Sequence, residues 1–94
     1  MPTHLRLDQE TQDLLLARLR RVGGQVEGLQ RMLMEGRDCA EIAHQVAAAR
    51  GALDRVAMDL IAAGLERCLR MQADGQPQAA DRLKKLKQTF LMLR

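Results

Sequence analysis

The chain has 94 residues, of which 47% are hydrophobic, and its formal net charge is +3 at pH 7. This length accommodates one domain, which we place over residues 1–94. No apolar run approaches the ~20 residues that a membrane-spanning helix needs. Charges interrupt the first part of the chain, so we expect no secretory signal. We therefore expect a cytoplasmic protein that has no contact with a membrane.

Helix-favouring residues dominate the composition, and Phe90 is the only aromatic residue. No β-branched stretch alternates with polar residues as a strand would. We expect an all-α subunit of two long helices in an antiparallel hairpin and a short C-terminal helix. Long helices with small apolar side chains build a thin core, so we expect further subunits to complete it.

The first helix is expected over residues 8–36, after a flexible arm at 1–7. Asp8 suits the N-cap. Three glycines interrupt this segment, at positions 23, 24 and 28, and we expect them to allow close approach of another helix. Apolar residues recur every three or four positions and predict one buried face: Leu15, Leu19, Val22, Val26, Leu29 and Leu33.

The second helix is expected over residues 38–72. Gly36 should end the first helix, and Asp38 with Glu41 matches a capping box for the second. A turn at 73–77 precedes the third helix, expected over 78–93. The apolar stripe of the second helix is Cys39, Ile42, Val46, Ala49, Leu53, Val56, Leu60 and Ala63, and that of the third is Ala79, Leu83, Leu86, Phe90 and Leu93.

Basic residues gather in two places, at Arg18, Arg20 and Arg21 and again over residues 84–87. An oligomer would repeat each basic patch, and a repeated basic surface suits nucleic acid. The chain has no glycine-rich phosphate loop, no Cys-x-x-Cys, no HExxH motif and no serine–histidine–aspartate set at a suggestive spacing. We therefore expect a binding protein rather than an enzyme.

The two cysteines lie near opposite ends of the second helix. At ~100° and ~1.5 Å per residue, Cys39 and Cys68 share a face but are roughly 43 Å apart. An antiparallel copy would place Cys39 beside the partner subunit's Cys68, which gives two equivalent two-sulfur sites per dimer. In a reducing compartment such thiols are metal ligands, redox sensors or small core residues. His44 does not share a face with Cys39, so we expect an exposed side chain, and the role of His4 stays open.

Three segments of the chain resemble one family of bacterial repressors. Residues 18–32, the run Arg37-Asp38-Cys39, and residues 47–57 are similar to the CsoR/RcnR family. The resemblance implies a three-helix subunit, an antiparallel dimer and a flat dimer-of-dimers homotetramer. It also implies binding of double-stranded operator DNA without a helix-turn-helix.

The same resemblance implies which residues contact the operator. The alternative for each arginine is a solvated charge or an intersubunit ion pair, most plausibly for Arg55 beside Asp54 and Asp59. The residues carried over are Arg18, Arg20, Arg21 and Arg55, with help from Lys84 and Lys85.

The effector site departs from that of the family's copper sensors, which use Cys, His and Cys. The cysteine positions match Cys39 and Cys68, but the histidine position is Gly64. The position before the first cysteine, often tyrosine, is Asp38, and the position of a glutamate in the third helix is Lys84. The family's nickel and cobalt sensors need several histidine ligands, so this chain matches them less well than it matches the copper sensors.

A two-cysteine site without histidine resembles the CstR branch, which senses sulfane sulfur. We expect reactive sulfur species to join Cys39 to the partner subunit's Cys68 by a disulfide or polysulfide, which releases the operator. No cofactor is then needed. The alternative is a Cu(I) sensor that uses the same two thiolates. A third interpretation is a formaldehyde-responsive repressor that uses Pro2 and Cys39.

Overall fold

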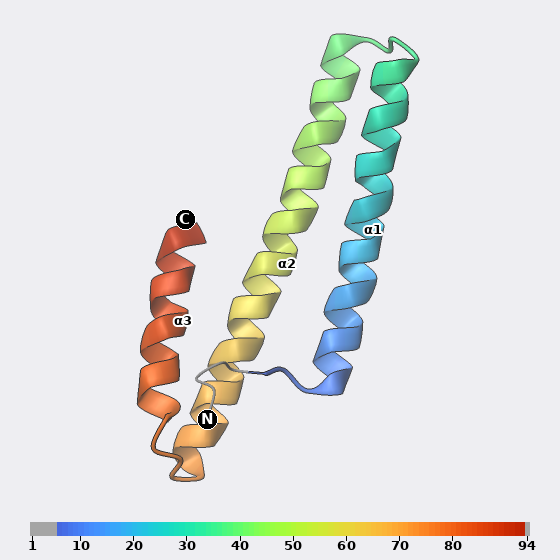
Figure 1. Cartoon of the computed structure of the whole chain (residues 1–94). Coiled ribbons are helices and arrows are strands. Elements are labelled where there is room, and N and C mark those ends of the chain that lie inside the picture. The colour runs from blue at the N-terminus through green and yellow to red at the C-terminus, as the bar shows by residue number, and fades with distance from the viewer. Residues whose placement is uncertain (1–5, 94) are drawn as a thin grey trace.

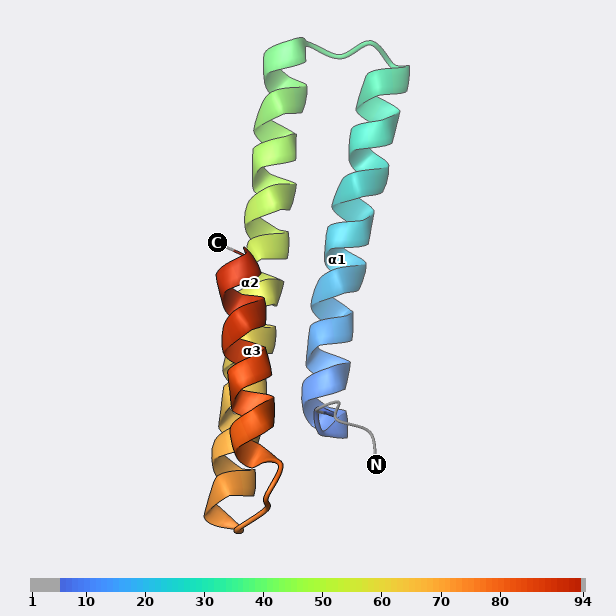
Figure 2. The ribbon, with the colours of Figure 1, turned by 60° about the vertical axis from the view of Figure 1, so that its left-hand side comes forward.

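The computed structural model describes residues 6–93, and this part of the chain is all-α, as expected (Figure 1). The three helices are α1 (Gln9–Met34), α2 (Cys39–Ala73) and α3 (Ala79–Leu93). Helices α1 and α2 form an antiparallel hairpin, and α3 turns back along the C-terminal half of α2 (Figures 1 and 2). The result is an elongated subunit measuring 57 × 25 × 19 Å.

Glycines at positive φ end the two long helices. Gly36 has φ 68° and Gly75 has φ 74°, a conformation that favours glycine because it lacks Cβ. Beyond each glycine a backbone N–H reaches back into the helix, from Arg37 to the Met32 carbonyl at 3.0 Å and from Gln76 to the Met71 carbonyl at 2.9 Å. These turns fix the hairpin and the return of α3.

Aspartates cap the starts of α1 and α2. The Asp8 carboxylate accepts the Thr11 N–H at 2.8 Å. Asp38 accepts the N–H groups of Ala40 at 3.1 Å and Glu41 at 3.3 Å. The expected capping box is wrong in its second half, because the Glu41 carboxylate is drawn to the Arg37 guanidinium rather than back to the Asp38 N–H.

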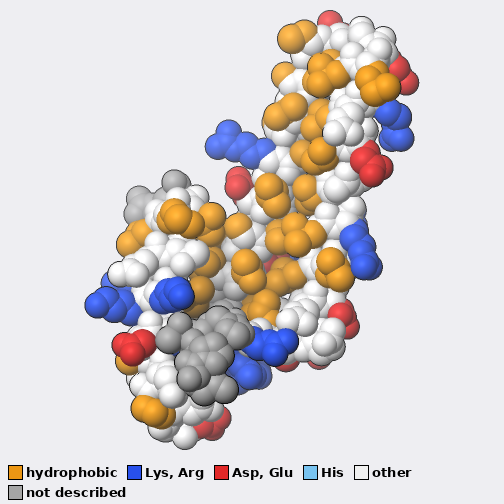
Figure 3. All heavy atoms as spheres, in the orientation of Figure 1, with side chains coloured by type: hydrophobic (Ala, Val, Ile, Leu, Met, Phe, Trp, Pro, Cys, Tyr) orange, Lys and Arg blue, Asp and Glu red, His pale blue; other side chains and the backbone are white. Residues whose placement is uncertain are grey.

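The apolar stripes are buried only in part. Leu15 and Val22 of α1 and Ala49 and Val56 of α2 form the seam of the hairpin. Several other large members of the same stripes remain exposed, and Figure 3 shows apolar side chains in a band along one face. None of the helices described combines the length and apolar character needed to cross a bilayer. The exposed stripe members are Leu19, Val26, Leu33, Val46, Leu53 and Leu60.

No other helix within residues 6–93 packs closely against the glycines of α1. A Cβ added at Gly23 or Gly24 would meet no atom within 4 Å, and one at Gly28 would meet only the Arg31 side chain. The expected close helix approach does not occur within residues 6–93 of one subunit, and approach by a helix of another subunit stays a prediction. These glycines lie on an open face.

Candidate nucleic-acid interface and thiol site

Three arginines from the two long helices meet at one cleft. Arg18 and Arg21 come from α1, and Arg55 comes from α2. The antiparallel hairpin places these segments side by side although they are far apart in the sequence. The cleft has a volume of about 350 Å³ and is lined by Arg18, Arg21, Val22, Gln25, Ala52, Arg55 and Val56. Guanidinium groups with an amide beside them suit phosphate oxygens.

One of these arginines is paired inside the subunit. The Arg18 Nη1 atom forms an ion pair with the Oδ2 atom of Asp59 on α2. The Asp59 Oδ2 atom is covered, although each of the two side chains keeps about a third of its surface exposed, 33% for Arg18 and 37% for Asp59. From the sequence alone, Asp59 was named only as a neighbour of Arg55 in the alternative of an intersubunit ion pair, and this pair within the subunit was not predicted.

The other basic residues expected at the DNA surface lie outside this cleft. Arg20 is exposed on α1 but does not line the cleft. Lys84 and Lys85 are exposed on α3, which packs on α2 and does not contact α1 within residues 6–93. The subunit alone therefore gathers three of the expected residues and leaves the lysines on a separate helix.

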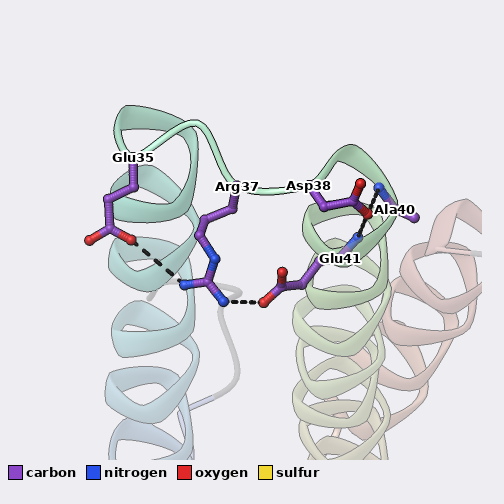
Figure 4. Close-up of polar contacts among 5 residues, drawn as sticks. All are labelled: Glu35, Arg37, Asp38, Ala40 and Glu41. Carbon is purple, nitrogen blue, oxygen red and sulfur yellow. Dashed lines mark hydrogen bonds and ion pairs between the residues drawn. The ribbon is translucent and has the colours of Figure 1, made fainter.

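Cys39 is exposed at the first residue of α2. Figure 4 shows the turn before the helix, where Asp38 caps the backbone and Arg37 lies between two carboxylates. The Arg37 guanidinium pairs with Glu41 and lies 3.6 Å from the Glu35 carboxylate. Cys39 is therefore accessible to a small reagent, while Arg37, two residues before it, is already engaged by carboxylates.

Cys68 lies in the opposite environment, near the C-terminal end of α2. Its side chain is only 1% exposed, and one turn later the Met71 sulfur lies 3.8 Å from the Arg82 Nη1 atom of α3. Burial raises the pKa of the Cys68 thiol, and the positive charge of Arg82 opposes that rise. Cys68 is therefore a protected thiol, whereas Cys39 is an open one.

The subunit does not assemble a multidentate metal site by itself. Within residues 6–93 no three His, Cys, Asp or Glu side chains lie close enough together to hold a metal ion. Gly64 is buried in α2, one turn before Cys68, and brings no ligand. His44 is exposed on α2, as expected. His4 and Pro2 lie outside the described residues.

Three neighbours of these sites were not identified from the sequence. Gln25 lines the arginine cleft, Asp59 pairs with Arg18, and Arg82 lies near Cys68. Folding the sequence back at Gly36 sets Arg18 opposite residue 54, about one helical turn short of Asp59, so the exact register of the hairpin is needed to find the first two. Arg82 depends on how α3 docks, which no local pattern specifies.

Comparison with known proteins places the chain in a family. Residues 11–91 match the family model described as metal-sensitive transcriptional repressor. The copper-sensing transcriptional repressor RicR of Mycobacterium tuberculosis is 39% identical over 75 residues, which cover 79% of this chain and 78% of RicR. An uncharacterised protein from Serratia marcescens is 37% identical over 76 residues, which cover 81% of this chain and 79% of that protein.

Two solved structures share the fold. The nickel-responsive transcriptional regulator InrS has a TM-score of 0.73 and 36% identity, with 93% of this chain and 97% of InrS covered. The copper-sensing repressor CsoR with Cu(I) from Geobacillus thermodenitrificans has a TM-score of 0.81 and 26% identity, with 95% of this chain and 92% of that chain covered. Its sequence, its three-helix fold and these relatives together show that the chain belongs to the family of metal-sensitive transcriptional repressors.

Proposed function

We propose that this repressor is a cytoplasmic homotetramer, a dimer of antiparallel dimers, that releases its operator in response to sulfane sulfur. The observation that carries the proposal is an effector position with two cysteines and no imidazole. Cys39 is open, Cys68 is protected, and Gly64 occupies the position where the resemblance to copper sensors predicts a histidine.

The DNA-binding half of the proposal rests on the arginine cleft, defined by Arg18, Arg21 and Arg55. Arginines bind phosphate oxygens through paired N–H donors, and each neutralised phosphate adds to the salt dependence of binding. Replacing Arg21 by Ala should weaken binding to all duplexes. It should also reduce the magnitude of the negative slope of log K against log salt by about 0.9 for each phosphate that is no longer neutralised. Glu27→Ala, on the same helix, is the control and should not weaken binding.

The sensing half is a two-step thiol exchange. The Cys39 thiolate attacks the sulfane sulfur of a low-molecular-weight persulfide, whose S–S bond breaks and whose thiol leaves. The product is a Cys39 persulfide. The partner subunit's Cys68 then attacks the inner sulfur and expels hydrosulfide, which leaves a disulfide between subunits. A second sulfur added before this step gives a trisulfide by the same displacement.

The burial of Cys68 supports a link between this reaction and DNA release. A bond to a sulfur that is 1% exposed requires the segment around Met71 and Arg82 to move. The same long helix carries Arg55, which lines the cleft, and Asp59, which pairs with Arg18. A shift of α2 thus changes the spacing of the arginines that hold the operator.

A second candidate is Cu(I) sensing, favoured by the 39% identity to the copper-sensing RicR. Two thiolates are a donor set that soft Cu(I) accepts. Cys39 and the partner subunit's Cys68 would hold the ion. A formaldehyde response through Pro2 and Cys39 ranks third, because it leaves Cys68 without a role.

The test exposes the DNA-bound protein in parallel to polysulfide, Cu(I), formaldehyde, peroxide and glutathione disulfide, followed by intact-mass analysis. We expect polysulfide alone to release DNA and to add whole sulfur atoms to a covalent dimer. Cys39→Ala should stay on DNA under polysulfide. Release by Cu(I) without any response to polysulfide would instead establish the second candidate.

A further inference from the structure

The Arg18–Asp59 ion pair lies at the arginine cleft and neutralises one of its three cations. Arg18 comes from α1 and Asp59 from α2, one turn beyond Arg55. Neither Arg21 nor Arg55 forms an ion pair within residues 6–93, so the carboxylate acts on a single arginine of the cleft. Arg18 is also the member of the cleft whose charge is least free to meet a phosphate.

We infer that Asp59 is an internal competitor for Arg18 that weakens operator binding by occupying the guanidinium a DNA phosphate would otherwise take. This inference rests on the proposed DNA-binding role of the cleft. Asp59 is thus a regulatory residue of that surface, although it does not itself contact DNA.

The geometry makes this competition possible. Each side chain of the pair keeps about a third of its surface exposed, so solvent and phosphate can reach the guanidinium. The Asp59 Oδ2 atom that faces Arg18 is covered while the pair is formed, so moving Arg18 to a phosphate costs this ion pair. A phosphate that takes Arg18 must overcome that cost and the repulsion from the Asp59 charge.

The expected change in DNA affinity follows from the small free energy that partly exposed ion pairs contribute. Removing the Asp59 charge frees Arg18 from the pair and is expected to tighten DNA binding about two- to five-fold for each Arg18 that binds a phosphate. The salt slope should steepen by about 0.9 for each additional phosphate that the protein neutralises. Several subunits on one operator would multiply the effect.

The experiment measures binding of the full chain to a fluorescein-labelled duplex from the region upstream of its own gene, with a shuffled duplex beside it, over a salt series. Asp59→Asn keeps the shape of the side chain and removes its charge, and Asp59→Ala serves as a second variant. Both should bind both duplexes more tightly and with a steeper salt slope. Unchanged or weaker binding by both folded variants would overturn the inference.

Two controls separate this mechanism from a general change of charge. Asp54→Asn removes the same charge from an exposed position of α2 that has no ion pair within the described residues, and it should tighten binding less. Asp59→Asn in an Arg18→Ala background should tighten binding no more than Asp54→Asn does; the same tightening as in the wild-type background would refute the competition. Wild-type protein that does not bind DNA, or that loses no affinity with Arg18→Ala, would instead defeat the proposed function.

Discussion

The two cysteines lie on the same helix but differ in their exposure to solvent. Cys39 is open to solvent at the first turn of α2, whereas Cys68 is buried near its other end. The sequence predicts their shared face from the helical period, but it does not predict the difference in burial. Burial depends on how the helices pack, and the contact between Met71 and Arg82 of α3 near Cys68 joins residues that are distant in the sequence.

This asymmetry predicts different thiol reactivities. Because the thiolate is the reactive form and burial raises the pKa of Cys68, iodoacetamide should label Cys39 at least several-fold faster in the reduced native protein at pH 8. Quenched labelling followed by peptide mass spectrometry measures both rates. Denaturant should equalise the rates, and faster native labelling of Cys68 would contradict its burial.

The same pKa shift predicts an alkaline loss of stability. The native state keeps the Cys68 proton while the unfolded state gives it up, so the free energy of unfolding should fall as pH rises above the ordinary range of a thiol. Urea titrations from pH 7.5 to pH 10 would show the fall. Cys68→Ser should show a smaller pH dependence, and identical pH profiles would contradict this assignment.

At the scale of the helices, the turn chemistry was largely predictable. Gly36 adopts positive φ and Asp38 caps α2, both as the sequence indicates. Glu41 was misassigned because a capping-box pattern specifies which groups are close in sequence, whereas Arg37 offers a charged partner from the turn. The Arg18–Asp59 pair was missed because it joins two helices, and its register is not specified by a local sequence pattern.

The caps give a prediction at this scale. Asp38→Ala leaves the N–H groups of Ala40 and Glu41 without their acceptor, so it should lower the free energy of unfolding by about 0.5–2 kcal/mol. Glu41→Ala removes only an exposed ion pair and should lower it by about 0–1 kcal/mol. Urea unfolding compares the two variants. An equal loss of unfolding free energy from both would indicate that Glu41 completes the capping box.

For the whole molecule, the fold class follows from periodicity, but the extent of the core does not. Half of the residues in the apolar stripe of α2 stay exposed in the subunit, among them Val46, Leu53 and Leu60, which are 49%, 51% and 45% exposed. The helical period shows that these residues share a face. It does not show whether that face packs against the same chain or against another copy. In the proposed tetramer the face packs against another copy.

This apolar face predicts the effect of a charge placed on it. Leu53→Lys should shift the protein to smaller species and weaken DNA binding, because a buried lysine at an intersubunit contact would lack a partner. Sedimentation velocity measures the change. Gln45→Lys, at an exposed polar position of α2, should leave the assembly intact. An unchanged sedimentation coefficient for Leu53→Lys would place the contact elsewhere.

The most direct test of the proposed sensor identifies which sulfurs are joined, and between which chains. Unlabelled and ¹⁵N-labelled protein are mixed until their subunits exchange, treated with polysulfide, digested without reductant and analysed by mass spectrometry. We expect linked peptides that contain Cys39 from one isotopic form and Cys68 from the other, with one or more bridging sulfur atoms in part of the product. Links only between like cysteines, or no link while DNA is still released, would contradict the proposed mechanism.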